Sequence, residues 1–445
     1  MSRTLLIKNV KIINENKMFE GDIRIKDQRF ESISKNISPS PQDTIINANG
    51  KFLLPGMIDD QVHFREPGLT HKGNIASESR AAVAGGITSY MEMPNVDPAT
   101  TTIEALEHKF SIAKKHSLAN YSFYLGATEH NIEQIKQLDP KKHCGLKVFM
   151  GASTGNLLVE NPEALNTIFK ECPTLIVTHC ESGPVIEKNL NTMTEQGITA
   201  TINDHPKIRD TQACYASSSY AVALAKKHNS QLHVLHITTE KELSLFEAGN
   251  IEDKHITAEA CVHHLWFSSD DYPALGNQIK CNPAIKSVRD RDALINALHT
   301  NQIDIIATDH APHTWQEKQV EYSKAPAGLP LVEHALLTLF DHVKHGRLSL
   351  TQVVEKTSHN PAKRYEIIDR GYIKEGYYAD FILVDMEKTT YATNENCRYL
   401  CGWTPFDQHT FSSSIEGTWI NGQQVYDGEN ILDHSIVSKR LEFNR

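Results

Sequence analysis

The sequence predicts an α/β protein: a (β/α)8 TIM-like barrel, with a small β-sandwich formed from both chain ends. Two observations favour this class. Between about Pro55 and Tyr365, apolar strand-like segments alternate with amphipathic segments of three- and four-residue periodicity. Outside that region, short alternating segments are separated by polar turns, which is typical of antiparallel strands. We therefore expect a composite sandwich domain from residues 1–54 and 366–445, and a barrel domain from residues 55–365.

The first β unit begins at Leu5 and extends to Ile46. Its segments "LLIKNVKII", "GDIRIKD" and "RFESIS" alternate apolar and polar residues, as half-buried strands do. The same pattern returns near the other end of the chain in "YYADFILVD" and "GTWINGQQVYDG". We expect the two ends to form one sandwich.

The central region supplies the expected barrel strands. They are, in order, "GMIDDQVHF", "GITSYMEMPN", "YSFYLGAT", "GLKVFMG", "TLIVTHCE", "QLHVLHIT", "HITAEAC" and "IDIIATDHAP". Segments such as "IEALEHKFSIAKKH" and "YASSSYAVALAKKH" lie between them and have helical spacing of apolar residues. The segment from Thr314 to Pro330 has no clear periodicity, so it is either a mobile loop over a site or an ordinary surface loop.

The composition argues against several function classes. The chain has 445 residues, of which 40% are hydrophobic, and its net charge of −10 is spread along the sequence. There is no dense Lys/Arg run, so nucleic acid is not an expected partner. No apolar run reaches the ~20 residues that span a bilayer, and the N-terminus turns polar too early for a signal peptide. We expect a cytoplasmic protein that does not bind membranes.

The eight cysteines are scattered and form no C-x-x-C pair. This spacing indicates reduced core thiols rather than a disulfide framework or a cysteine zinc site.

Polar residues stand at the ends of most expected strands, where the active site of a barrel lies. They are Gln61, His63 and Arg65 on the first strand, Asn95 on the second, Lys147 on the fourth, His179 on the fifth, His236 on the sixth, and Asp309 and His313 on the eighth. A lone histidine on a strand is more often a core residue, but convergence from several strands favours metal ligands. Nitrogen and oxygen donors without thiolates suit Zn²⁺ in an open, hydrolytic site.

The chain resembles the amidohydrolase superfamily and, within it, the dihydroorotases. The segments "DDQVHFREPG", "MEMPN", "GLKVFMGASTGN", "THCE", "LHITT", "ITAEACVHHL", "CNPAIK" and "ATDHAPH" carry the resemblance over nearly the whole chain, and "GYIKEGYYADFILVD" resembles the closing β segment. The resemblance implies reversible cyclisation of N-carbamoyl-L-aspartate to L-dihydroorotate in pyrimidine biosynthesis. It also implies small-molecule substrates and a homodimer.

The resemblance assigns a role to each candidate residue. Lys147 would be carboxylated by CO₂ and bridge two zinc ions, with His179 and His236 on one ion and His63 and Asp309 on the other. A zinc-activated hydroxide would be the nucleophile, and Asp309 would be the general acid and base. The substrate would be bound by Arg65, Asn95, Asn282 and His313. The alternative for Lys147 is a core lysine in a salt bridge.

Gln61 departs from the family pattern Asp-x-His-x-His, because it stands where the first histidine is usual. An amide oxygen is a weak zinc ligand, so we expect one tight and one weak metal, unless Asp60 or a water held by Gln61 replaces the ligand. Three other readings stay open at this point. The chain could be a hydantoinase or allantoinase, a non-catalytic dihydroorotase homologue, or a purely structural binding module. Arg65 favours a dihydroorotase, since hydantoin and allantoin lack the ring carboxylate that a guanidinium binds.

Overall fold

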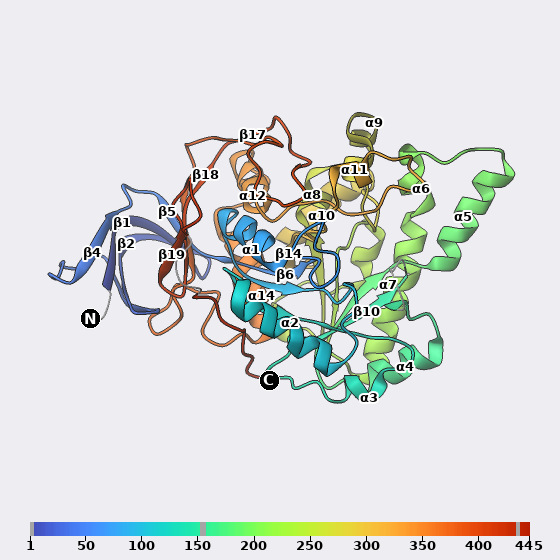
Figure 1. Cartoon of the computed structure of the whole chain (residues 1–445), viewed down its shortest axis with the longest axis horizontal. Coiled ribbons are helices and arrows are strands. Elements are labelled where there is room, and N and C mark those ends of the chain that lie inside the picture. Colours follow the sequence, from blue (N-terminus) through green and yellow to red (C-terminus); the bar gives the residue numbers. More distant parts are fainter. Residues whose placement is uncertain (1–3, 152–156, 433–436) are drawn as a thin grey trace.

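The computed structural model describes residues 4–151, 157–432 and 437–445, and Figure 1 shows a β-sheet unit beside a larger α/β unit. The residues "ASTGN", which end one of the motifs above, lie outside the described residues. Both chain ends contribute to the β-sheet unit, while the middle of the chain builds the α/β unit (Figure 1).

Two parallel sheets form the centre of the α/β unit. The first contains β6 (Met57–Val62), β7 (Ile87–Glu92) and β8 (Asn120–Phe123). The second contains β9 (Leu125–Gly126), β10 (Leu146–Met150), β11 (Ile176–Cys180), β12 (Leu232–Val234), β13 (Ile256–Cys261) and β14 (Ile305–Ala307), paired in this order. The parallel α/β class is therefore confirmed.

The two sheets approach each other at both of their edges. Only Tyr124 separates β8 from β9 along the chain, and Val62 forms a parallel bridge with His310, just beyond β14. Within the described residues, however, the ladders do not join into one closed sheet. The closed eight-stranded barrel therefore stays a prediction.

Helices surround these sheets (Figure 1). They are α1 (Ile75–Ala84), α2 (Ile103–His116), α3 (Ile132–Ile135), α4 (Pro162–Glu171), α5 (Gly183–Glu195), α6 (His205–Ile208), α7 (Thr211–His228), α8 (Val262–Trp266), α9 (Tyr272–Leu275), α10 (Val288–His299), α11 (Trp315–Lys318), α12 (Ala335–Lys344), α13 (Leu350–Val354) and α14 (Asn360–Tyr365). Several begin at a side-chain cap. Asn74, for example, accepts a hydrogen bond from the Ser77 amide, which satisfies an otherwise unpaired group of α1. Among the described residues, no helix is both long and apolar enough to cross a membrane.

One sheet combines strands from both chain ends. Its order is β19 (Gln423–Tyr426), β18 (Ser414–Ile420), β15 (Phe381–Asp385), β5 (Phe52–Pro55), β1 (Thr4–Asn14), β2 (Lys17–Lys26) and β3 (Arg29–Ser34), with β4 (Asp43–Asn47) paired to β1. Leu53 pairs with Leu383, and the rings of Phe381 and Trp419 stack 4.7 Å apart in its core. The ladders form one sheet and do not separate two facing sheets, so the expected sandwich stays a prediction, as do the domain limits.

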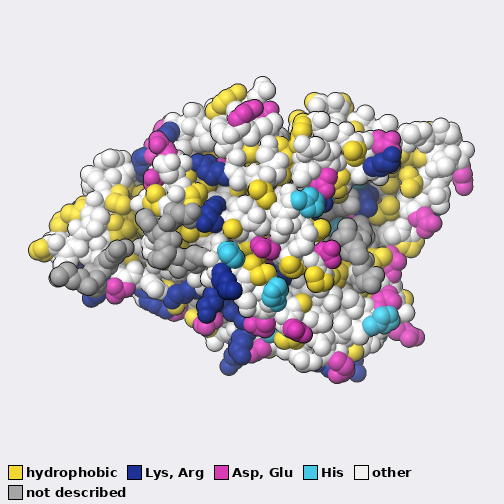
Figure 2. All heavy atoms as spheres, viewed as in Figure 1, with side chains coloured by type: hydrophobic (Ala, Val, Ile, Leu, Met, Phe, Trp, Pro, Cys, Tyr) yellow, Lys and Arg dark blue, Asp and Glu magenta, His cyan; other side chains and the backbone are white. Residues whose placement is uncertain are grey.

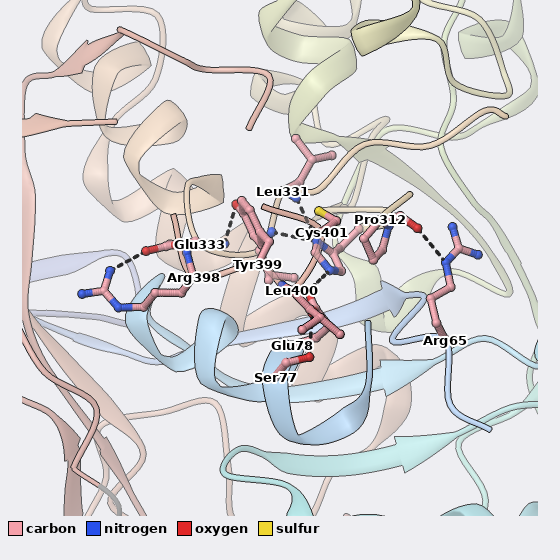
Figure 3. Close-up of polar contacts among 12 residues, drawn as sticks. Arg65, Ser77, Glu78, Pro312, Leu331, Glu333, Arg398, Tyr399, Leu400 and Cys401 are labelled. Carbon is pink, nitrogen blue, oxygen red and sulfur yellow. Dashed lines mark hydrogen bonds and ion pairs between the residues drawn. The ribbon is translucent and has the colours of Figure 1, made fainter. Parts of the chain in front are cut away.

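The segment between β15 and β18 leaves this sheet and packs against the α/β unit. It contains the short strands β16 (Thr390–Tyr391) and β17 (Thr410–Phe411), and Trp403 lies buried in the same apolar cluster as helix α12. The Leu400 amide donates to Glu78 of α1, and Arg398 pairs with Glu333 (Figure 3). The Trp403 indole donates to the His313 carbonyl at 2.7 Å, so this segment supports a candidate site residue.

Candidate active site

The ten candidate site residues all line one cavity of about 220 Å³ at the C-terminal ends of the parallel strands. The lining consists of Gln61, His63, Arg65, Asn95, Lys147, Phe149, His179, His236, His263, Cys281, Asn282, Asp309, Ala311, His313 and residues 326–329. Four of these, Phe149, His263, Cys281 and Ala311, were not singled out from the sequence, although "ACVHHL" and "CNPAIK" contain two of them. The structure thus brings the predicted side chains together.

Three of the lining residues have an unusual backbone conformation. Arg65 has φ 70°, His236 has φ 40° and Asp309 has φ 50°. Positive φ is uncommon for residues other than glycine and costs free energy that the surrounding fold must offset. Each of the three follows the end of a parallel strand, where this conformation turns the chain sharply. Such strain, repeated on three strand ends, is typical of a functional site.

His179 and His236 face each other through ring nitrogens. The Nε2 of His179 donates to Glu181 at 3.0 Å, which leaves its Nδ1 directed at the Nε2 of His236, also at 3.0 Å. Burial lowers the pKa of both imidazoles, so both are neutral at neutral pH. Neutral imidazoles whose second nitrogen is held by a carboxylate are the usual form of a histidine metal ligand.

Glu181 is itself held by a cation. Arg209 donates to its Oε2 at 2.5 Å, and the carboxyl group has no exposed surface. Burial raises the pKa of Glu181, but Arg209 and His179 outweigh burial and lower it to about 2. The carboxylate behind His179 is therefore ionised, which fixes the tautomer of that ring.

His63 and Asp309 form a second pair. His63 Nδ1 donates to the Asn95 side chain at 2.7 Å, so its Nε2 lone pair faces Asp309 Oδ1 at 3.1 Å. Burial lowers the pKa of His63. Burial raises the pKa of Asp309, but its interaction with His63 outweighs burial and the net shift is downward. Two lone pairs at this distance need a proton or a cation between them, which fits a metal site.

Lys147 lies among these ligands on β10, with 1% of its surface exposed. Its ammonium lies 4.7 Å from the centre of the Phe149 ring, and burial lowers its pKa to about 8 although Asp309 and Glu259 oppose that shift. No salt bridge of Lys147 is present among the described residues. The core salt bridge considered from the sequence is therefore not observed in that part of the chain.

Arg65 projects toward the cavity from the turn after β6. Its Nε donates to the Pro312 carbonyl at 3.1 Å (Figure 3), and one terminal nitrogen lies 3.1 Å from His313 Nε2. Burial lowers its pKa to about 10, which leaves the guanidinium charged at neutral pH. His313 in turn contacts Lys72 at 3.1 Å. A buried positive charge beside metal-ligating groups is suited to hold a carboxylate.

The segment from Thr314 to Pro330 lies over the site, since residues 326–329 line the cavity. Gly328 has φ 141°, and a Cβ there would lie 2.4 Å from the Ala311 carbonyl, so only glycine permits this close approach. The buried ammonium of Lys318 donates to three carbonyl oxygens, those of Lys280, Pro326 and Gly328. The segment is thus held against the cavity by backbone contacts.

Gln61 lies on the cavity floor beside a cysteine. Its Oε1 is 3.6 Å from Cys261 Sγ, and that thiol also lies 3.3 Å from Glu259 Oε1. Asp60, considered from the sequence as a replacement ligand, is not among the cavity-lining residues. Its Oδ2 accepts from Tyr365 at 2.8 Å and lies 3.3 Å from His233 Nε2. Asp60 also belongs, with His233 and Glu259, to a buried group of potential metal ligands, so its role as a replacement ligand stays a prediction.

A larger cavity of about 600 Å³ lies elsewhere, between α2, the segment around Tyr378 and the C-terminal residues. Lys and Arg side chains gather on the face shown in Figure 2. The arginines of this cavity are paired: Arg29 with Asp369, Arg370 with Asp380 and Arg440 with Glu107. Since its arginines are paired locally and none of its described lining residues is a histidine, the smaller cavity is the better candidate for catalysis.

Comparisons with known proteins identify the family of this chain. The sequence model of the amidohydrolase family matches residues 52–425. The chain is 34% identical to a dihydroorotase from Methanosphaera stadtmanae over 92% of this chain and 93% of that protein. It is 32% identical to a dihydroorotase from Bacillus subtilis, over 95% and 98% of the two chains. Among solved structures, an L-hydantoinase from Arthrobacter aurescens has a TM-score of 0.93 at 25% identity, covering 99% of this chain and 100% of that one.

Proposed function

The chain belongs to the amidohydrolase family, and we propose that it catalyses the reversible cyclisation of N-carbamoyl-L-aspartate to L-dihydroorotate. This reaction forms and opens a cyclic amide in pyrimidine biosynthesis. The chain is thus a cyclic amide hydrolase that acts on a small molecule.

Arg65 is the observation that carries this assignment. Hydrolysis of any cyclic amide needs the metal ligands. Dihydroorotate also has a ring carboxylate, which needs a binding partner of its own. The charged, 6% exposed guanidinium beside His63 supplies a partner for that carboxylate. The similarity in fold to an L-hydantoinase does not decide between the two substrates, because one fold serves several chemistries.

The metal ligands are a further part of the proposal. Amidohydrolases are metal-dependent, and the close approach of neutral His179 to neutral His236, and of the His63 Nε2 lone pair to Asp309, fits divalent cations. We assign one zinc to His179 and His236, a second to His63 and Asp309, and carboxylated Lys147 to both. The pKa of about 8 favours carboxylation, because only a neutral amine reacts with CO₂. Bound zinc would lower the pKa of water and polarise the amide carbonyl.

The protein side chains perform the remaining steps. Arg65 and His313 hold the substrate carboxylate, Asn95 donates to another polar atom of the substrate, and the Asn282 side-chain oxygen accepts from the edge of its ring. Asn282 Oδ1 is buried without a hydrogen-bond partner among the described residues, which supports a contact with substrate. Asp309 accepts the proton of the attacking water and delivers it to the leaving nitrogen, and the reverse transfer serves ring closure.

The finer architecture is also inferred. The two parallel sheets close into an eight-stranded barrel at Tyr124 and at the bridge between Val62 and His310. The terminal sheet folds over into a sandwich. All eight cysteines are free, as suits a cytoplasmic enzyme, and we expect a homodimer.

Turnover measurements test the function directly. Purified protein supplied with zinc should interconvert N-carbamoyl-L-aspartate and L-dihydroorotate, measured in both directions. Absence of turnover at full metal loading would identify a non-catalytic homologue. Faster opening of hydantoin or allantoin than of dihydroorotate would overturn the role of Arg65 and leave the metal assignment intact.

A further inference from the structure

The residues beside Gln61 form a second group of potential metal ligands. Cys261, His263 and His264 offer ligand atoms that all lie within 4.8 Å of one another, and all three side chains are buried. Cys261 Sγ is 3.6 Å from Gln61 Oε1, so this group adjoins the position where the family pattern lacks a histidine.

The strand register places this group beside the strand end that carries Asp309. Cys261 pairs with Ala307 in the ladder between β13 and β14. His263 and Asp309 each follow these partners by two residues, so they leave neighbouring strand ends together. Both line the cavity, as do Gln61 and His63.

His263 is available as a ligand. Neither of its ring nitrogens makes a hydrogen bond of good geometry among the described residues, although the ring lies near the Thr308 backbone, and its exposed surface is 0%. Buried polar atoms without partners are uncommon and need an explanation, such as a ligand that the site is built to hold. His264 is a weaker candidate, because its Nε2 already lies 3.1 Å from the Pro283 carbonyl.

We propose that Cys261 and His263 complete the second metal site, where they replace the histidine that Gln61 displaces. The site then binds its cation through a thiolate and an imidazole beside His63 and Asp309. This inference rests on the proposed function, since it takes the metal centre of the family as given. A coordinated thiol loses its proton to a divalent cation, and a thiolate shifts selectivity toward soft metals such as zinc and cadmium.

Cobalt spectroscopy tests the inference independently of activity. The full-length protein is stripped with a chelator and titrated with Co²⁺, and a thiolate ligand gives a sulfur-to-cobalt charge-transfer band in the near ultraviolet. The band should appear only when the second equivalent of Co²⁺ is added. Cys261→Ser should abolish it and weaken the second site on the order of 100-fold.

Two variants serve as controls. Cys281→Ser changes another buried cysteine, one that lines the cavity and whose Sγ lies 3.2 Å from the Pro283 carbonyl, and should keep the band. Gln61→His combined with Cys261→Ser should restore the second equivalent of metal without the band. His263→Asn should weaken the second site while the band persists at saturating cobalt.

Zinc X-ray absorption on the unmodified protein needs no variant. It should show a sulfur neighbour at about 2.3 Å, as zinc thiolates do. A protein that binds two cobalt ions without the band, binds only one ion, or keeps the band in Cys261→Ser overturns the inference. Dihydroorotate turnover is measured on the same samples: turnover without the band leaves the proposed function standing, whereas the band without turnover overturns only that function.

Discussion

The two halves of the ligand set differ in the groups that support them. In the imidazole half, comprising His179 and His236, the Nε2 of His179 donates to Glu181, whose carboxylate is ionised beside Arg209. In the glutamine half, comprising Gln61, His63 and Asp309, the Nδ1 of His63 donates to the neutral side-chain amide of Asn95. An ionised carboxylate strengthens the ligand that it contacts more than a neutral amide does. The comparison therefore predicts unequal metal affinities for a reason beyond Gln61 itself.

The glutamine half nevertheless retains its geometry. His63 is still oriented by Asn95, and Asp309 keeps its strained backbone conformation. If the site were no longer functional, we would expect the neighbouring ligands to be replaced as well. His63 and Asp309 are still present. The loss of the histidine ligand at Gln61 is therefore local. A group that compensates for it is expected at the adjoining end of β13.

Lys147→Gln should have the largest effect on activity, because the proposal assigns the Lys147 side chain to the metals of both halves. We expect kcat/KM for dihydroorotate to fall ~1000-fold or more, about 4 kcal/mol of transition-state stabilisation, with loss of bound metal from both halves. Steady-state kinetics and metal analysis measure this. Lys356→Gln is the matched control: Lys356 is equally buried but donates to Asn301 and Ile303 outside the cavity, so metal content should persist. Loss of metal from one half only would show that Lys147 does not join them.

Arg65→Met should have the next largest effect and should leave both halves loaded with metal. Methionine keeps apolar bulk but removes the donor to a buried carboxylate, so kcat/KM should fall by about 2–4 kcal/mol. Kinetics with dihydroorotate and with hydantoin distinguish the charge effect, since hydantoin has no carboxylate. Equal losses on both substrates would mean that Arg65 supports the turn after β6 and does not bind the substrate.

The sequence located the site because its residues stand at strand ends, and strand ends can be read from apolar periodicity. It did not reveal the contact between Arg209 and Glu181, because that contact depends on how the chain after α6 returns to the end of β11. The proximity of Cys261 to Gln61 was also hidden, since it depends on ladder register between distant segments. Trp403 shows the same limit: it falls within residues 366–445, which the sequence assigns to the sandwich domain, yet its indole donates to the His313 carbonyl.

The supporting carboxylate of the imidazole half can be removed alone. Glu181→Gln should weaken metal binding to His179 and His236 by ~10–100-fold, because the ring loses an ionised acceptor for its Nε2 hydrogen. Competition with a chromogenic chelator measures the change. Glu242→Gln is the control, since Glu242 is buried nearby but bonds Ser218 and Thr239 and contacts neither histidine. If both variants weaken metal binding equally, the effect arises from the fold and not from the support of His179.

Gln61→His should have the smallest effect. It should reduce the difference in metal affinity between the two halves. In the unmodified protein, mild chelation should remove the metal of the glutamine half first, because an amide oxygen is a weaker ligand than an imidazole nitrogen. The substitution should tighten that metal by ~10-fold, about 1.4 kcal/mol, with the affinity of the imidazole half unchanged. Stepwise chelation with metal analysis at each step measures both sites in one sample.

Two equally tight metals before substitution would contradict the weak-site expectation, and would mean that a neighbouring group already supplies the missing ligand. Cys261 Sγ lies close enough to Gln61 to be that group, so combining Gln61→His with Cys261→Ser then separates the contribution of the thiol from that of the new imidazole.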